Sequence, residues 1–62
     1  MLMGRLREER KKSRLTQQEL ARISGVDRVT IARLETGATR RASLETARKL
    51  ARALKVAPGD LA

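Results

Sequence analysis

The chain has 62 residues, of which 15 are lysine or arginine and 7 are aspartate or glutamate, so its net charge is +8. A chain this short buries about 60% of its unfolded surface, which allows one core but no deep cleft. It has no cysteine and no histidine, which excludes disulfides, thiolate chemistry and imidazole catalysis. We expect a single small domain, residues 1–62, that is not an enzyme and binds no cofactor, no metal and no small-molecule substrate.

The excess of positive charge predicts a polyanionic partner. Most of the basic residues are arginine, whose guanidinium group suits bidentate contacts with phosphate and guanine. Because the chain has no aromatic residue, it lacks the stacking surfaces on which single-strand and many RNA binders rely. The expected partner is therefore double-stranded DNA.

No apolar run approaches the roughly 20 residues of a membrane span, and the first residues lack the apolar core of a signal peptide. We therefore expect no membrane partner and a cytoplasmic, nucleoid-associated location.

Short breaks separate five helical patterns, which indicate an all-α domain. The first helix is predicted at residues 4–13, with Leu6 facing inward and Arg10 one turn later on the same face. The second is predicted at residues 17–24. It opens with a capping box formed by Thr16 and Glu19 and ends at Gly25, which supplies a left-handed conformation.

Asp27 is expected to cap a third helix at residues 28–36, which ends at Gly37. Ser43 is expected to cap a fourth helix at residues 44–54, and Pro58 fits the first turn of a short fifth helix at residues 58–61. The fourth helix has the clearest apolar stripe, formed by Leu44, Ala47, Leu50, Ala51 and Leu54.

The second and third helices are joined by only three residues, so neither has a long face to bury alone. Crossed at a steep angle over a common core, they form a helix-turn-helix. Ala21 is small where the third helix approaches, Gly25 makes the turn, and Val26 and Ile31 fill the angle between the helices.

This pattern resembles the DNA-binding domain of the phage lambda repressor and Cro family, also called the XRE family. The resemblance runs through LREER, LTQQELARISGVDRVTIARLETG and SLETARKLARALKVAPGDL. It implies a five-helix, lambda-repressor-like domain that binds operator DNA as a transcriptional regulator.

A helical wheel of residues 28–36 places Ile31 and Leu34 on the buried side and leaves the opposite side free for the DNA groove. The residues expected to contact bases are Arg28, Val29, Ala32 and Arg33, which are also the positions that the resemblance implies. The residues expected to contact phosphates are Thr16, Gln17, Thr36, Thr39, Arg40, Arg41 and Ser43.

The resemblance further implies a partly buried ion pair between Arg10 and Glu35, and a Gln17 side chain that grips the DNA backbone and supports Arg28. The sequence departs from the family pattern at three positions. Lys55 stands where glycine usually ends the fourth helix, Ala42 stands where proline is common, and Ser24 stands at a commonly apolar position. The hydroxyl of Ser24 is expected to bond back to the carbonyl of Leu20.

Together these observations predict a sequence-specific regulator, most simply a repressor that occupies a pseudo-palindromic operator with half-sites about 10 bp apart. A weak or DNA-induced homodimer is expected, with residues 1–3 and 56–62 as candidate contacts. Two alternatives stay open at this point: a nonspecific architectural DNA binder, and an antitoxin-type protein-interaction module.

Overall fold

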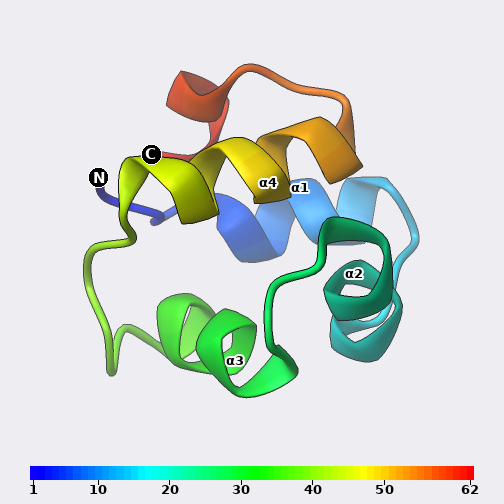
Figure 1. Ribbon diagram of the computed structural model, residues 1–62, viewed down its shortest axis with the longest axis horizontal. Coiled ribbons are helices and arrows are strands. Elements are labelled where there is room, and N and C mark those ends of the chain that lie inside the picture. The colour runs from blue at the N-terminus through cyan, green and yellow to red at the C-terminus, as the bar shows by residue number, and fades with distance from the viewer.

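The computed structural model describes all residues, 1–62, and consists of helices joined by short loops (Figure 1). Its elements are α1 (Leu6–Lys12), α2 (Gln17–Ser24), α3 (Arg28–Thr36), α4 (Leu44–Leu54) and η1 (Pro58–Leu61). There is no strand, and the one β-bridge joins Leu2 to Arg41. The predicted all-α, helix-turn-helix class is confirmed. None of the helices has the length and hydrophobicity needed to cross a membrane.

Local sequence signals set the ends of the three central helices. Thr16 accepts a hydrogen bond from the backbone N–H of Glu19, whose carboxylate accepts one from the backbone N–H of Thr16, so the capping box is complete. The carboxylate of Asp27 accepts from the N–H of Val29 at 3.1 Å, and Ser43 caps α4 in the same way. Each of these bonds satisfies an N–H that the helix itself leaves unpaired.

The two terminal helices differ from the prediction. The α1 helix is shorter than residues 4–13 because it has no side-chain cap; Arg5 instead donates its backbone N–H to the carbonyl of Leu61. The predicted fifth helix is a single 3₁₀ turn, so the fold has four α-helices. Bonds from Asp60 to Ala57 and from Ala62 to Gly59 span three residues, as that tighter helix requires.

Twelve apolar residues from every helix and from the connecting segments form one core. Around this core, α2 packs against both α3 and α4, and α1 packs against α3. Leu44 was predicted to belong to the apolar stripe of α4 but is 54% exposed. As the first residue of the helix it lies at the edge of the packed region, beside charged residues of α4.

Two turns are built differently from the expectation. The Ser24 hydroxyl does not bond back to Leu20; it accepts a hydrogen bond from the N–H of Val26 at 3.1 Å, which supports the turn between α2 and α3. Lys55 adopts the left-handed conformation normally left to glycine, with a φ of 58°. The N–H of Val56 then reaches the carbonyl of Ala51, which closes the end of α4.

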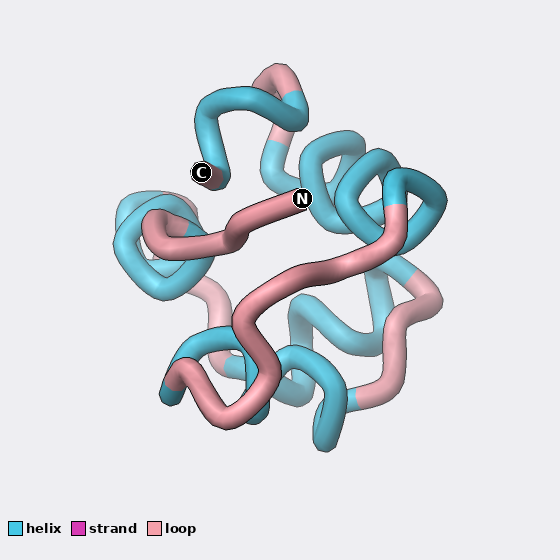
Figure 2. The backbone as a smooth tube through the Cα atoms, turned by 90° about the vertical axis from the view of Figure 1, so that its left-hand side faces the viewer, coloured by secondary structure: helices cyan, strands magenta, loops and turns pink.

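The first residues run beside the loop that leads from α3 to α4, and the two chain ends lie close together (Figure 2). The N–H of Ala42 donates to the carbonyl of Met1 at 2.8 Å, and the terminal ammonium of Met1 donates to the carbonyl of Ala42. A proline at position 42 could not donate this bond. The departure from the family pattern at Ala42 therefore has a structural role, because it ties the loop to the amino-terminal segment.

Candidate nucleic-acid interface

The helix α3 presents one side to the core and the other to solvent. Ile31 and Leu34 are buried, whereas Arg28, Val29 and Arg33 are exposed. Val29 is 45% exposed and is one of four large apolar side chains that the protein leaves open to solvent, with Leu2, Ile23 and Leu44. Ala32 is half-buried and Thr36 is exposed. The solvent side of α3 thus carries two cations and an apolar surface, the groups that read guanine edges and thymine methyls.

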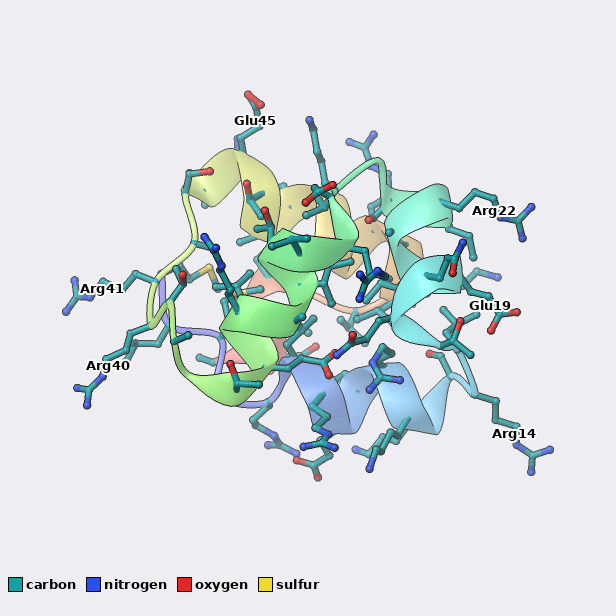
Figure 3. The ribbon with its side chains drawn as sticks, turned by 90° about the horizontal axis from the view of Figure 1, so that it is seen from below. Arg14, Glu19, Arg22, Arg40, Arg41 and Glu45 are labelled. Carbon is teal, nitrogen blue, oxygen red and sulfur yellow. The ribbon has the colours of Figure 1, made fainter.

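The exposed arginines on and beside α3 are not neutralised within the chain. The four ion pairs of the structure involve Arg5, Arg10, Lys12 and Lys49. Four arginines on α3 or in the loop after it have no acidic partner: Arg28, Arg33, Arg40 and Arg41. Figure 3 shows Arg40 and Arg41 extending away from the protein beside α3. Unpaired cations on one side of a small basic protein favour contact with a polyanion.

A buried polar network fixes α3 against its neighbours. Arg10 forms a bidentate pair with Glu35, with Nε to Oε2 at 2.6 Å and Nη2 to Oε1 at 3.0 Å. The same guanidinium donates to the carbonyl of Leu15 at 2.7 Å. The side chains of Arg10 and Glu35 are 11% and 2% exposed, so the predicted ion pair forms and lies in the protein interior.

Gln17 joins this network, which the sequence did not indicate. Its Nε2 donates to Oε1 of Glu35 at 3.1 Å, and the residue is half-buried. The side chain that was expected to support Arg28 and contact phosphate is therefore directed toward Glu35. Three helices, α1, α2 and α3, meet at a single carboxylate, and the angle of α3 is set by that junction.

The hydroxyl groups that are expected to contact phosphates differ in whether they already donate a hydrogen bond within the protein. The hydroxyl oxygen of Thr16 accepts a hydrogen bond in the capping box, and its hydrogen remains free to donate to a phosphate. Ser43 accepts from the backbone N–H of Thr46 and donates to the Thr46 hydroxyl, so its hydrogen, which a phosphate contact would need, is already used within the protein. Thr36 donates to the carbonyl of Arg33 at 3.3 Å. Of the predicted phosphate contacts, Arg40, Arg41, Thr39 and Thr16 are the more accessible.

Two carboxylates hold their charge more strongly in the folded protein than in the unfolded chain. Burial acts to raise the pKa of Glu35, but hydrogen bonds from Arg10 and Gln17 and the charge of Arg10 outweigh it, so the pKa lies below its ordinary value of 4.5. The backbone N–H of Thr16 lowers the pKa of Glu19. Both carboxylates therefore bind protons less readily in the folded state.

We expect the thermal midpoint to be steady from pH 7 to about pH 5 and to fall below pH 4.5, the ordinary value of these carboxyls. The stabilisation that the ionised carboxylates of Glu35 and Glu19 give is present above their pKa in the unfolded chain. It is lost as the pH falls through their lower pKa in the folded protein. Thermal unfolding followed by circular dichroism at a series of pH values from 7 to below 4.5 tests this expectation. The Glu35→Gln variant should show a shallower acid decline than the wild type, whereas Glu8→Gln should not; parallel declines for all three would contradict the assignment to Glu35.

The fold and the exposed, cationic side of α3 define a helix-turn-helix DNA-binding protein. Residues 6–61 match the helix-turn-helix family, and the chain belongs to that family, of the XRE or lambda-repressor type. It is a sequence-specific DNA-binding regulator of transcription.

The structure is similar to the high-resolution crystal structure of the restriction-modification controller protein C.AhdI from Aeromonas hydrophila. The TM-score is 0.85 and the sequence identity is 43%, over 94% of this chain and 86% of that chain. A comparison with curated proteins finds no match.

Proposed function

We propose that the protein regulates transcription by placing α3 in the major groove of a pseudo-palindromic operator, as a weak or DNA-induced homodimer. The observation that carries this proposal is the combination of unpaired arginines on the solvent side of α3 with the buried Arg10–Glu35–Gln17 network that holds the helix. A recognition helix must be both exposed and fixed in angle, because base contacts depend on geometry.

Arg28 and Arg33 are the residues that we assign to base edges. A guanidinium group can donate two hydrogen bonds to O6 and N7 of guanine, which no other base presents in that arrangement. Val29 and Ala32 offer apolar contact with thymine methyls. Arg28 lies in the first turn of α3, and Arg33 lies five residues further along the helix, so the two would reach different base pairs.

Phosphate contacts on either side of the groove would hold α3 in position relative to these base pairs. Arg40, Arg41 and Thr39 lie in the loop after α3, and Thr16 and Gln17 lie at the amino end of α2. The amide of Gln17 is bonded to Glu35, so its side chain would contribute through a second N–H or by exchanging that bond. Thr36 and Ser43 lie nearby, but their hydroxyls are bonded within the protein, so they would contribute only by exchanging those bonds. These contacts position the protein on DNA without specifying its sequence.

The dimer contact is proposed at the surface where the two chain ends meet. Leu2, which is 53% exposed, lines a shallow apolar groove of about 240 Å³ together with Met3, Gly4, Leu34 and Ala62. An exposed apolar surface on a protein this small favours association. Leu2, Met3 and Ala62 belong to the segments predicted as candidate contacts, residues 1–3 and 56–62, which supports that location, whereas Gly37 and Arg40 of the α3–α4 connection also line the groove.

The similarity to C.AhdI supports a more specific role. At 43% identity over nearly the whole chain, we propose that this protein also controls the transcription of restriction-modification genes. We propose repression by occupying an operator as the mechanism. This role places the protein in the cytoplasm, on the nucleoid.

The experiment that tests the proposal is selection from a pool of duplexes with a randomised core, at two salt concentrations. We expect enrichment of a motif with two-fold symmetry that survives the higher salt, because base contacts do not release counterions. Retention of DNA without enrichment, lost steeply as salt rises, would contradict the proposal and favour a nonspecific architectural binder. Failure to retain DNA, together with copurification of a second protein, would favour an antitoxin-type module.

A further inference from the structure

Two residues other than glycine adopt a left-handed backbone conformation: Arg14, with a φ of 57°, and Lys55, with a φ of 58°. Both are basic, and both follow the end of an α-helix. The Cβ atom of an L-residue is crowded in this conformation, whereas glycine adopts it freely. The chain therefore carries a basic side chain at two positions where glycine would suit the backbone better.

Hydrogen bonds account for the backbone of Arg14 but not for its side chain. Its N–H donates to the carbonyl of Lys11 at 2.9 Å, and the N–H of Leu15 donates to the carbonyl of Arg10. A glycine would make the same bonds. The Arg14 side chain is exposed and has no ion pair, so nothing within the protein uses its guanidinium group.

Arg14 lies on the opposite side of α3 from the arginines of the loop. Figure 3 looks at the molecule from the side of α3, with Arg40 and Arg41 extending on one side and Arg14 and Arg22 on the other. The turn that carries Arg14 leads directly to Thr16 and the amino end of α2. Arg22 has the carboxylate of Glu19 nearby on the same helix, whereas Arg14 has no such neighbour.

The size of the domain matches the two sides of a DNA groove. The Cα atoms extend 22 Å along the longest axis, which runs across the view of Figure 3, whereas the major groove is about 12 Å wide. With α3 in the groove, the two sides of the protein therefore lie over the two phosphodiester strands that border it. In this placement Arg40 and Arg41 would meet one of these strands, and Arg14 would face the other.

We propose that Arg14 is a phosphate-contacting residue that positions the domain on the strand opposite to the one held by Arg40 and Arg41. This inference rests on the proposed placement of α3 in the major groove. It explains why a strained position carries arginine: the side chain serves DNA binding at some cost to folding.

The test compares Arg14→Gly with Lys55→Gly. Each variant removes one positive charge and relieves the same backbone strain after a helix, but Lys55 ends α4, away from α3 in Figure 1. Both variants should melt at or above the wild-type temperature. Only Arg14→Gly should weaken binding to duplex DNA, by about eightfold per protomer at 0.1 M salt. The negative slope of log K against log salt should become less steep by about 0.9 per protomer.

A third variant, Arg14→Gln, removes the charge but keeps the backbone conformation of a non-glycine residue, so it should show the same loss of affinity without the gain in melting temperature. Equal affinity losses for Arg14→Gly and Lys55→Gly would overturn the inference, because net charge alone would then explain them. An unchanged affinity and salt slope for Arg14→Gly would overturn it too. A wild-type protein that binds duplexes without sequence preference contradicts the proposed reading of an operator by α3, yet the comparison of variants still decides the role of Arg14.

Discussion

The Glu35→Ala variant is expected to lose about 3–5 kcal/mol of folding free energy, because it leaves Arg10 charged, buried and without its partner. The Arg10 and Glu35 side chains are 11% and 2% exposed, so the protein largely shields the Arg10 guanidinium from the water that would replace the lost contact. A chain of this length is expected to have a total stability of only roughly 3–9 kcal/mol. The substitution should therefore lower the thermal midpoint by about 12 °C or more, and it could leave much of the protein unfolded at room temperature.

The matched control is Glu8→Ala. Glu8 also pairs with an arginine, Arg5, but the two side chains are 54% and 52% exposed, and exposed pairs of this kind contribute about 0–1 kcal/mol. Urea and thermal unfolding followed by circular dichroism measure both variants. If the two substitutions lower stability equally, the buried network has no special role in the fold.

A double variant separates stability from orientation. Replacing the pair by apolar residues of similar size, Arg10→Met with Glu35→Leu, should recover much of the lost stability, because it removes both buried charges together. It also removes the link from Gln17 to Glu35 and the bond from Arg10 to the Leu15 carbonyl. We expect this variant to fold but to bind DNA less selectively, since the hydrogen bonds that fix the angle of α3 are gone.

The ends of the central helices could be predicted from the sequence because they depend on local chemistry. Thr16, Asp27 and Ser43 each cap a helix with an oxygen that reaches a backbone N–H two or three residues further on, and Gly25 and Gly37 end helices with a positive φ. The start of α1 was misplaced because no side chain caps it; a bond to Leu61, far along the chain, sets that end instead.

Several features that the sequence did not indicate depend on the tertiary structure. The period of α4 places Leu44 on the apolar stripe, but periodicity cannot show that the first turn of a helix extends beyond its neighbours and leaves Leu44 exposed. The hydrogen bond between Gln17 and Glu35 joins residues 18 positions apart, and the pairing of Met1 with Ala42 joins residues 41 apart. Patterns within one helix carry no information about such contacts.

Removal of a base-reading arginine is the second large expected effect. The Arg33→Ala variant should lose about 1–3 kcal/mol of discrimination at one base pair of each half-site, because the bidentate contact with guanine disappears. A dimer carries the substitution twice, so the expected loss for a full operator is about 2–6 kcal/mol. Arg33 is exposed and makes no ion pair within the protein, so its removal should leave the melting temperature nearly unchanged. Arg28→Ala should behave in the same way at a different base pair.

Two control variants distinguish base reading from electrostatic attraction. Arg40→Ala removes a proposed phosphate contact from each protomer, so it should weaken binding equally for all sequences and make the salt slope less steep by about 0.9 per protomer. Arg48→Ala removes an exposed arginine of α4 and should change neither sequence preference nor stability appreciably. Competition binding with single-base operator variants separates these results. If Arg33→Ala weakens binding to every duplex by the same factor, then Arg33 contacts phosphate rather than bases, and sequence reading must depend on Arg28 and Val29 instead.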